Sequence, residues 1–318
     1  MRKKTILSII IFSLVFLTGY FTYFKIKNVL SQKESFFPII AVKHEGPTMR
    51  IKGFKLEESN GEKLEWVLAA DEAQMFKDKG EILFTTVSTD VKGDGKKKEG
   101  YVIKSSSGMY YTKEDKINFS GKVDVNTSNG YNFTTESVLY TAKDKKLATD
   151  DDIAVKGTLE KGDKIFVTGK GFNGNAETGD FNIRDKVYTK VGANLEIKSN
   201  KVTINTKKST AIFVNEIVAK KDKMNIKGDK LEVTYGKSGD VNDIDVEGNV
   251  KLMMDKKVAL CDNAVIKGNS SEIVLTGKPE LHVGEDIMVG EKIVFFTDND
   301  EVFVEKVKAD VSRRGYKK

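Results

Sequence analysis

The chain has 318 residues, and its 39% hydrophobic content is too high for a disordered tail. Its 53 Lys and Arg residues face 47 Asp and Glu residues, so the net charge of +6 is a small surplus that does not indicate a nucleic-acid partner. A single cysteine, Cys261, excludes an internal disulfide and any multi-cysteine metal site.

The first segment with a clear meaning is the apolar run of residues 5–24, which follows a basic start and contains no charged residue. A helix of this length covers about 30 Å, the hydrocarbon thickness of a bilayer. A cleaved signal peptide is the alternative, but aromatic residues such as Tyr20 and Phe24 stand where its small residues would be expected. We therefore predict a retained transmembrane anchor within residues 1–30, with the rest of the chain outside the cytoplasm.

From residue 50 onward, apolar and polar residues alternate strictly, and helical spacing is almost absent. This alternation predicts an all-β chain whose strands have one dry and one wet face. The clearest segments are 64–68, 117–119, 123–125, 138–140, 153–155, 181–183, 195–197, 202–204, 212–214, 231–235, 244–246, 273–275, 293–295 and 302–304.

Short Gly-, Asn- and Asp-rich turns separate these segments and indicate antiparallel hairpins. The sequence pattern of residues 107–125 is repeated, with differences, in residues 231–252. We therefore predict two tandem modules, residues 31–195 and 196–318, joined without a flexible linker. Because the wet face carries Lys, Asp and Glu, the apolar face must lie inside a sandwich, an open barrel or a jelly roll. Sequence alone leaves open whether that interior is a packed core or a groove.

Several short motifs lack the surrounding residues that their functions require. Residues 169–174 match a dinucleotide fingerprint, but no helix pattern follows them. Residues 236–238 resemble the end of a P-loop without its first glycine, and a calcium-loop pattern from Asp243 has Met254 where an acid is required. Only His44 and His282 are available as histidines, and Cys261 has no local base. We therefore expect neither an enzyme nor a cofactor nor a metal site.

Ordered phrases in the first module resemble the LptC family, a bitopic inner-membrane component of lipopolysaccharide export. They are GFKL at 53–56, EWVLAA at 65–70, SSSGMYY at 105–111, SGKVDV at 120–125, TESVLY at 135–140, LAT at 147–149 and VTGKGF at 167–172. The second module resembles the LptA/OstA family through GNVKL at 248–252, ALCDNA at 259–264, IVLTGKPEL at 273–281 and GEKI at 290–293. The fusion of the two is a departure, since members of these families are usually separate proteins.

The resemblance implies two tandem antiparallel β-jelly-rolls whose apolar interior holds the acyl chains of lipopolysaccharide. It also implies an inner-membrane ABC transporter, with permeases and an ATPase, as a partner, since this chain has no nucleotide site. A further OstA-like module or an outer-membrane assembly component would join by edge-strand addition. The expected location is the inner membrane, with a single span and the C-terminal region in the periplasm.

The candidate lipid-binding residues are inward apolar side chains. In the first module they are Trp66, Leu68, Phe84, Tyr110, Phe119, Val123, Phe133, Tyr140 and Phe172. In the second they are Val233, Tyr235, Val250, Leu252, Leu275, Leu281 and Phe295. The alternative hypothesis is a membrane-anchored structural or adhesive β-protein with a solid core.

Overall fold

A computed structural model describes residues 46–306, apart from 61–62, 93–99, 115, 129, 142–145, 176–177, 237, 269–270 and 300. The predicted anchor at residues 1–30 and the basic end of the chain, residues 312–318, lie outside these residues. No helix long and apolar enough to cross a membrane occurs within the described ranges.

The described residues form twenty β-strands, and the prediction of an all-β chain is confirmed. The first seven strands are β1 (Met49–Asn60), β2 (Lys63–Phe76), β3 (Glu81–Val91), β4 (Tyr101–Tyr111), β5 (Lys116–Thr127), β6 (Asn132–Thr141) and β7 (Lys146–Thr158). The next seven are β8 (Lys164–Asn175), β9 (Asp180–Val191), β10 (Leu195–Ser199), β11 (Lys201–Asn205), β12 (Thr210–Lys221), β13 (Met224–Tyr235) and β14 (Val241–Met254). The last six are β15 (Lys257–Lys267), β16 (Glu272–Thr276), β17 (Glu280–Val283), β18 (Asp286–Val289), β19 (Lys292–Phe296) and β20 (Val302–Glu305).

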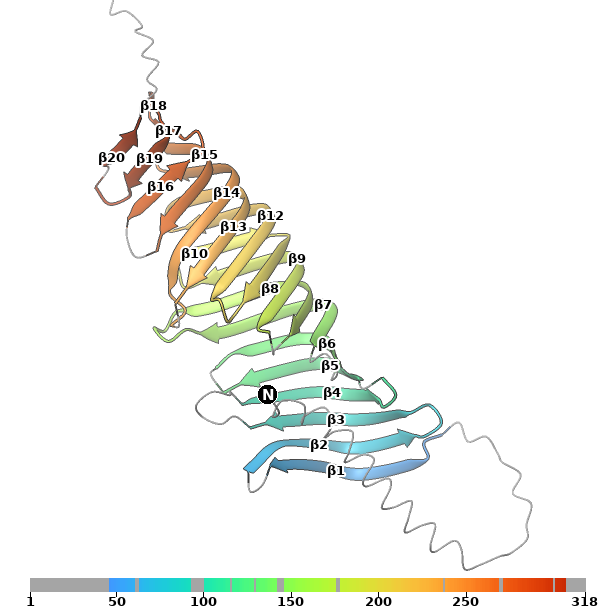
Figure 1. Cartoon of the computed structure of the whole chain (residues 1–318). Coiled ribbons are helices and arrows are strands. Elements are labelled where there is room, and N and C mark those ends of the chain that lie inside the picture. Colours follow the sequence, from blue (N-terminus) through green and yellow to red (C-terminus); the bar gives the residue numbers. More distant parts are fainter. Residues whose placement is uncertain are drawn as a thin grey trace, which may run out of the picture. The chain divides into compact units, whose positions relative to one another are not determined.

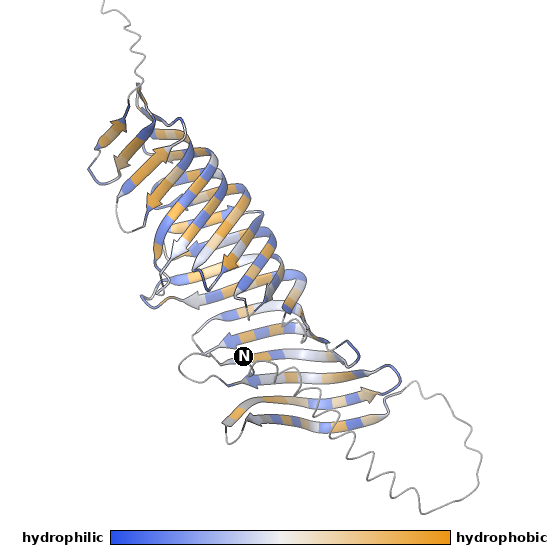
Figure 2. Cartoon of the chain, in the orientation of Figure 1, coloured by the Kyte–Doolittle hydropathy of each residue, from blue (hydrophilic) through white to orange (hydrophobic). Residues whose placement is uncertain are grey.

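The chain divides into two compact units. The first unit holds β1 to β5 and most of β6, and the second holds most of β7 and all of β8 to β20. In the first unit, β1 to β5 pair in sequence as antiparallel hairpins. In Figure 2 apolar and polar residues alternate along the strands, as expected for sheets with one dry face.

The second unit is also an antiparallel meander, but some of its strands are broken in the middle. β10 and β11 are two halves of one strand, because both pair with β9 on one side and with β12 on the other. β16 and β17 are likewise two halves that both pair with β15. The β9–β10 pairing also carries the sheet without interruption through residues 191–195, where the sequence predicted a module boundary.

Left-handed backbone turns bend the unbroken strands at corresponding places. In β5, Gly121 and Lys122 have φ angles of 76° and 57°, and in β14 Gly248 and Asn249 have φ angles of 75° and 48°. The strand register shifts beside Gly248, as expected for a bulge, which bends and twists a strand. These two glycines occupy the same position in the repeated phrase, so the internal repeat is also a repeat of backbone geometry.

The bends place the strand halves of the second unit in two layers, which Figure 1 shows one behind the other for β12 to β15. A single cluster of buried apolar side chains from both halves of these strands fills the space between the layers. The fold of this unit therefore encloses a long apolar interior.

Candidate functional site

The interior of the second unit is lined by three rows of side chains, each running straight across neighbouring strands. The first row is Val167, Thr189, Ile197, Ala219, Ile226, Leu252, Ala259, Leu281 and Met288. The second row is Phe172, Ile183, Val202, Phe213, Leu231, Val246, Ala264, Leu275, Ile293 and Val304. The third row is Gly174, Phe181, Ile204, Ala211, Val233, Ile244, Ile266, Ile273, Phe295 and Val302. We call the layer with the first row the first layer, and the layer with the other two rows the second layer.

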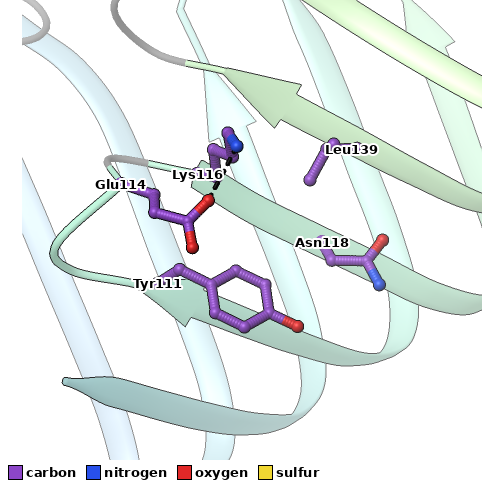
Figure 3. A pocket seen from close by; sticks show the side chains of 5 residues that line it. All are labelled: Tyr111, Glu114, Lys116, Asn118 and Leu139. Atoms are coloured by element: carbon purple, nitrogen blue, oxygen red, sulfur yellow. Dashed lines mark hydrogen bonds and ion pairs between the residues drawn. The ribbon is translucent and has the colours of Figure 1, made fainter. Parts of the chain in front are cut away.

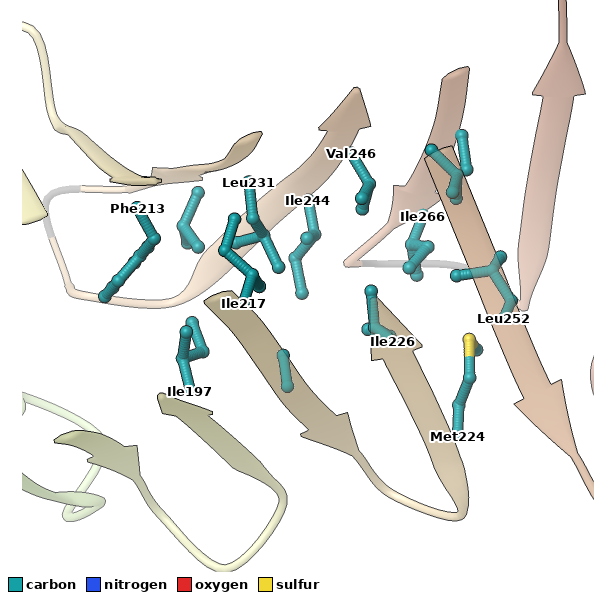
Figure 4. Close-up of a cluster of buried hydrophobic side chains, with 14 of the residues drawn as sticks. Ile197, Phe213, Ile217, Met224, Ile226, Leu231, Ile244, Val246, Leu252 and Ile266 are labelled. Carbon is teal, nitrogen blue, oxygen red and sulfur yellow. The ribbon is translucent and has the colours of Figure 1, made fainter. Parts of the chain in front are cut away.

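These rows contain no charged side chain, and their central members are almost completely buried. Leu231, Leu275 and Ile293 have no exposed surface, because each layer covers the other. Figure 4 shows side chains from both layers, Ile226 and Val246 among them, turned toward a common interior. The rows make a continuous apolar strip whose chemistry suits alkyl chains and no polar ligand.

The inward face of the first unit is built the same way but is less completely covered. One cross-strand row runs through Ile51, Ala73, Phe84, Gly108 and Phe119. A Cβ on Gly108 would lie 3.2 Å from Val87 Cγ2, which is tight, and at ordinary contact distance from the rings of Phe84 and Phe119, so the chain is closely packed at this glycine. Ile51 is half-buried, so this apolar face remains partly open at β1.

Most of the predicted site residues are buried apolar side chains of these two interiors. Those with less than a tenth of their surface exposed are Leu68, Phe84, Tyr110, Phe119, Val123, Val233, Val250, Leu252, Leu275, Leu281 and Phe295. Phe133, Tyr140, Phe172 and Tyr235 are half-buried, and the side chain of Trp66 lies outside the described part of the chain. Burial shows that these side chains pack inside, while lipid contact stays a prediction.

The structure also identifies inward residues that the site prediction left out. Ile197, Ile226, Leu231, Ile244, Ile273 and Ile293 are more deeply buried than most of the chosen residues. Their signal in the sequence is the same strand alternation that identifies the predicted residues. Continuity of the rows, which depends on strand register, was not visible in the sequence.

Some polar groups are buried within each unit. The hydroxyl oxygens of Thr89 and Thr135 have no hydrogen-bond partner among the described residues. Thr89 lies in the inward row between Leu68 and Ile103. Burial also raises the pKa of Tyr101 and of Tyr235, and Tyr131 contributes to the second shift. These tyrosines are therefore neutral inside the protein.

A separate hollow of about 320 Å³ lies on the first unit and is lined by Tyr111, Glu114, Lys116, Asn118 and Leu139 (Figure 3). Lys116 Nζ lies 2.7 Å from a carboxylate oxygen of Glu114. Tyr111 pairs with Lys116 across β4 and β5, next to the buried pair of Tyr110 and Ile117. Because neighbouring residues of a strand point to opposite faces, this hollow lies on the other face from the apolar interior.

The structure assigns no chemistry to the remaining candidates. Among the described residues, no group of three or more His, Cys, Asp or Glu side chains is placed to hold a metal ion. Burial raises the pKa of the Cys261 thiol to about 11, so the thiol is protonated at neutral pH and a poor nucleophile. Asp243, where the calcium-loop pattern begins, instead lies 3.3 Å from Lys267 Nζ.

Comparison with known proteins gives two adjoining family matches. Residues 15–192 match the model of the family described as lipopolysaccharide-assembly, LptC-related. Residues 196–301 match the family described as the LptA/(LptD N-terminal domain) LPS transport protein. No curated protein matches the chain.

Among solved structures, the chain is similar to LptH from Pseudomonas aeruginosa, described as the LptA homologous periplasmic component of the lipopolysaccharide transport device. The two sequences are 14% identical, and the superposition has a TM-score of 0.33. It covers 39% of this chain and 89% of LptH. The LptC-related match, by contrast, spans more than half of the chain. The chain therefore belongs to the LptC-related family of lipopolysaccharide-assembly proteins.

Proposed function

We propose that this chain is a non-enzymatic conduit that shields the acyl chains of lipopolysaccharide along its apolar interior. The observation that supports it best is the set of three rows in the second unit, which are apolar apart from Thr189 and contain no charged side chain. The candidate residues of the first unit would serve in the same way. The family matches, one in each predicted module, support lipopolysaccharide as the cargo.

The energetics of transfer explain why such a strip is needed. Each buried CH₂ group contributes about 0.8 kcal/mol, so an acyl chain of roughly a dozen carbons costs about 10 kcal/mol to leave in water. A lipid with several such chains would not diffuse freely through an aqueous compartment. An apolar strip shared by many strands lowers this cost at every point along the path.

Because the second unit is closed in this structure, loading requires its two layers to part. The rings of Phe133, Phe172 and Tyr235 are half-buried and are therefore more accessible than the fully buried core of this unit. We place the first contact of an acyl chain with this unit at these rings. The deeply buried residues would meet lipid only after the layers separate.

The proposal includes the predicted location and partners. The predicted anchor would hold the chain in the inner membrane, with the β-strands in the periplasm, beside an ABC transporter whose ATPase supplies the energy for extraction. Among the described strands, β1 pairs only with β2 and β20 only with β19. These edges would accept a strand from a further OstA-like module or from an outer-membrane assembly component.

Native mass spectrometry of the full chain, purified from a lipopolysaccharide-producing host, tests the conduit. We expect an acylated glycolipid to co-purify, and to be lost in Tyr235→Asp and in Phe119→Asp. Thr234→Asp and Asn118→Asp, the outward neighbours, should keep it. Tyr235 is half-buried, so its variant is expected to stay folded, which circular dichroism checks. A folded wild-type chain that carries no glycolipid and refuses added lipopolysaccharide would overturn the proposal.

One observation favours the second candidate, a structural or adhesive protein with a solid core. Leu231, Ile244 and Leu275 are as fully buried as the core of any rigid β-protein. Hydrogen exchange separates the two functions. A conduit should show added protection, or new exchange, in β12 to β15 when lipopolysaccharide is supplied, whereas a solid core should show no change.

A further inference from the structure

The outward side of the first layer carries a row of side chains unlike the rest of the surface of the second unit. The row crosses five strands through Lys198, Val218, Lys227, Lys251 and Leu260. Neighbouring strands lie about 4.8 Å apart, so the row extends about 19 Å over a continuous sheet. Lys220, one position beyond Val218 on the same side of β12, adds a fourth lysine. We call these six residues the basic face.

All four lysines of the basic face are exposed, and none of them forms an ion pair among the described residues, although Glu196 lies opposite Lys220 on β10. Lys227 lies directly opposite Lys251 on the neighbouring strand, an arrangement that repulsion between like charges disfavours. An anion bound over the two ammonium groups would offset this repulsion. The four lysines outnumber the two acids that lie directly beside the face, Glu196 opposite Lys220 and Glu280 opposite Leu260, so the basic face is positively charged.

The outward side of the second layer provides the contrast. There Lys230 Nζ lies 3.0 Å from Glu247, Lys267 Nζ lies 3.3 Å from Asp243, and Lys292 Nζ lies 3.0 Å from Glu305. On β13, for example, Lys230 is ion-paired on the outward side of the second layer, and Lys227 is not ion-paired on that of the first.

The positive charge of this face affects the pKa of a neighbouring glutamate. The pKa of Glu196 is lowered, chiefly by a hydrogen bond from Lys190, and Lys220 and Lys198 lower it further. Lys190 Nζ lies 2.7 Å from a carboxylate oxygen of Glu196. Because Glu196 is already ion-paired with Lys190, it does not neutralise the four lysines.

Apolar side chains stand among the lysines. Val218 is 48% exposed and Leu260 is 38% exposed, at positions where an outward strand residue would be expected to be polar. Ile287, which is 61% exposed, follows on the same side of the sheet, in the row through Lys220, Asn225, Met253, Val258 and His282. The Lys198 ammonium also lies 6.0 Å from the centre of the Tyr188 ring.

We propose that the basic face lies against the surface of a bilayer that contains anionic lipids. Lysines attract lipid phosphates, while exposed aliphatic side chains gain by entering the interfacial region. A soluble polyanion would use the lysines but leave Val218, Leu260 and Ile287 in water. The flat face of a sheet also matches a bilayer surface better than a narrow ligand. This inference concerns the outward side of the unit and does not depend on what the interior carries.

Fluorescence quenching in vesicles tests the proposal on the full chain. Cys261→Ala removes the buried thiol, Leu260→Cys supplies a labelling site on the basic face, and Val274→Cys supplies one on the outward side of the second layer. Each protein is reconstituted into vesicles of phosphatidylcholine alone or of phosphatidylcholine with phosphatidylglycerol. Lipids that carry a quencher in the headgroup region report contact, so that membrane insertion of an anchor does not by itself give a signal.

We expect the label at position 260 to be quenched several-fold more in the anionic vesicles, and the label at position 274 to be quenched equally in both. Joint replacement of Lys198, Lys220, Lys227 and Lys251 by Gln should abolish the difference, and joint replacement by Arg should preserve it, because surface attraction follows charge. High salt should weaken it. Equal quenching of the label at position 260 in both lipids would overturn the proposal. So would complete loss of quenching on addition of soluble polyphosphate at stoichiometric amounts, since the face would then be a site for polyanions in general.

Discussion

The rings of Phe133 and Phe172 lie with their centroids 5.4 Å apart, and Phe172 also stacks on Phe181 at 6.0 Å. Phe133 and Phe172 are only half-buried, whereas the residues of the second row from Ile183 to Ile293 are almost fully buried. The interior of the second unit therefore begins with an accessible aromatic group and continues into a closed aliphatic core. This gradient determines where lipid contact should be detected first.

A photoreactive amino acid at Phe172 should crosslink to lipopolysaccharide more strongly than one at Asn173. The two positions are adjacent in β8, but Phe172 belongs to the interior row and Asn173 is exposed on the other side. Crosslinked glycolipid is detected by a shift on a denaturing gel and by antibody. Equal yields at the two positions, or a higher yield at Asn173, would contradict an interior path.

Leu231→Ala should lower the free energy of unfolding by about 2–5 kcal/mol, the usual cost of removing a buried leucine side chain. Leu231 has no exposed surface and lies between Phe213 and Val246 in the second row. Thr234→Ala, an outward change on the same strand, should alter the free energy by no more than about 0.5 kcal/mol. Denaturant unfolding measures both. A small effect of Leu231→Ala would mean that the two layers are loosely packed in solution.

The segments predicted from strand alternation lie in thirteen of the twenty strands, and none lies in β1, β3, β4, β8, β15, β17 or β18. The predicted segments 117–119 and 123–125 both alternate, and both lie in strands. They are, however, the two halves of one strand, β5, joined through the left-handed pair Gly121 and Lys122. A Ser-Gly-Lys phrase reads as a turn in sequence, because glycine inside a strand and glycine in a hairpin give the same local signal.

The site was predictable only in part, for a related reason. Alternation identified Leu252 and Leu275 as inward, which the structure confirms. It could not show that Leu252 continues the row of Ile226 and Ala259, since pairing depends on bulges that shift the register between β13 and β15. It also could not show that Lys227 and Lys251 meet, although each was visibly an outward lysine.

Thr86→Gly should raise the free energy of unfolding by about 1 kcal/mol, because it relieves a strained backbone. Thr86 has a φ of 52°, a conformation that a β-branched residue disfavours and glycine adopts freely. Its neighbour Thr85 is equally exposed but has no such φ, so Thr85→Gly should destabilise the chain by about 1 kcal/mol. Thermal and denaturant unfolding of the two variants should move in opposite directions. Parallel shifts would show that the bend in β3 does not depend on the residue at position 86.

Cys261 should make stability fall as the pH rises through the alkaline range. Its folded-state pKa of about 11 lies above the ordinary value of 9.0, because burial disfavours the thiolate. The neutral thiol is thus preferred more strongly in the folded state. Its contribution is fully present below about pH 9, where both states are protonated, and is lost between about pH 9 and 11 as only the unfolded thiol ionises.

Denaturant unfolding of the wild type and of Cys261→Ala across this range isolates the effect, because tyrosines and lysines titrate equally in both proteins. The wild type should lose about 2 kcal/mol relative to the variant, since a shift of one pKa unit corresponds to about 1.4 kcal/mol. The same burial predicts slow reaction of the native thiol with Ellman's reagent at pH 8 and rapid reaction after unfolding. Parallel stability curves together with fast native labelling would place Cys261 at an open surface and would show that the layers of the second unit are already apart without lipid.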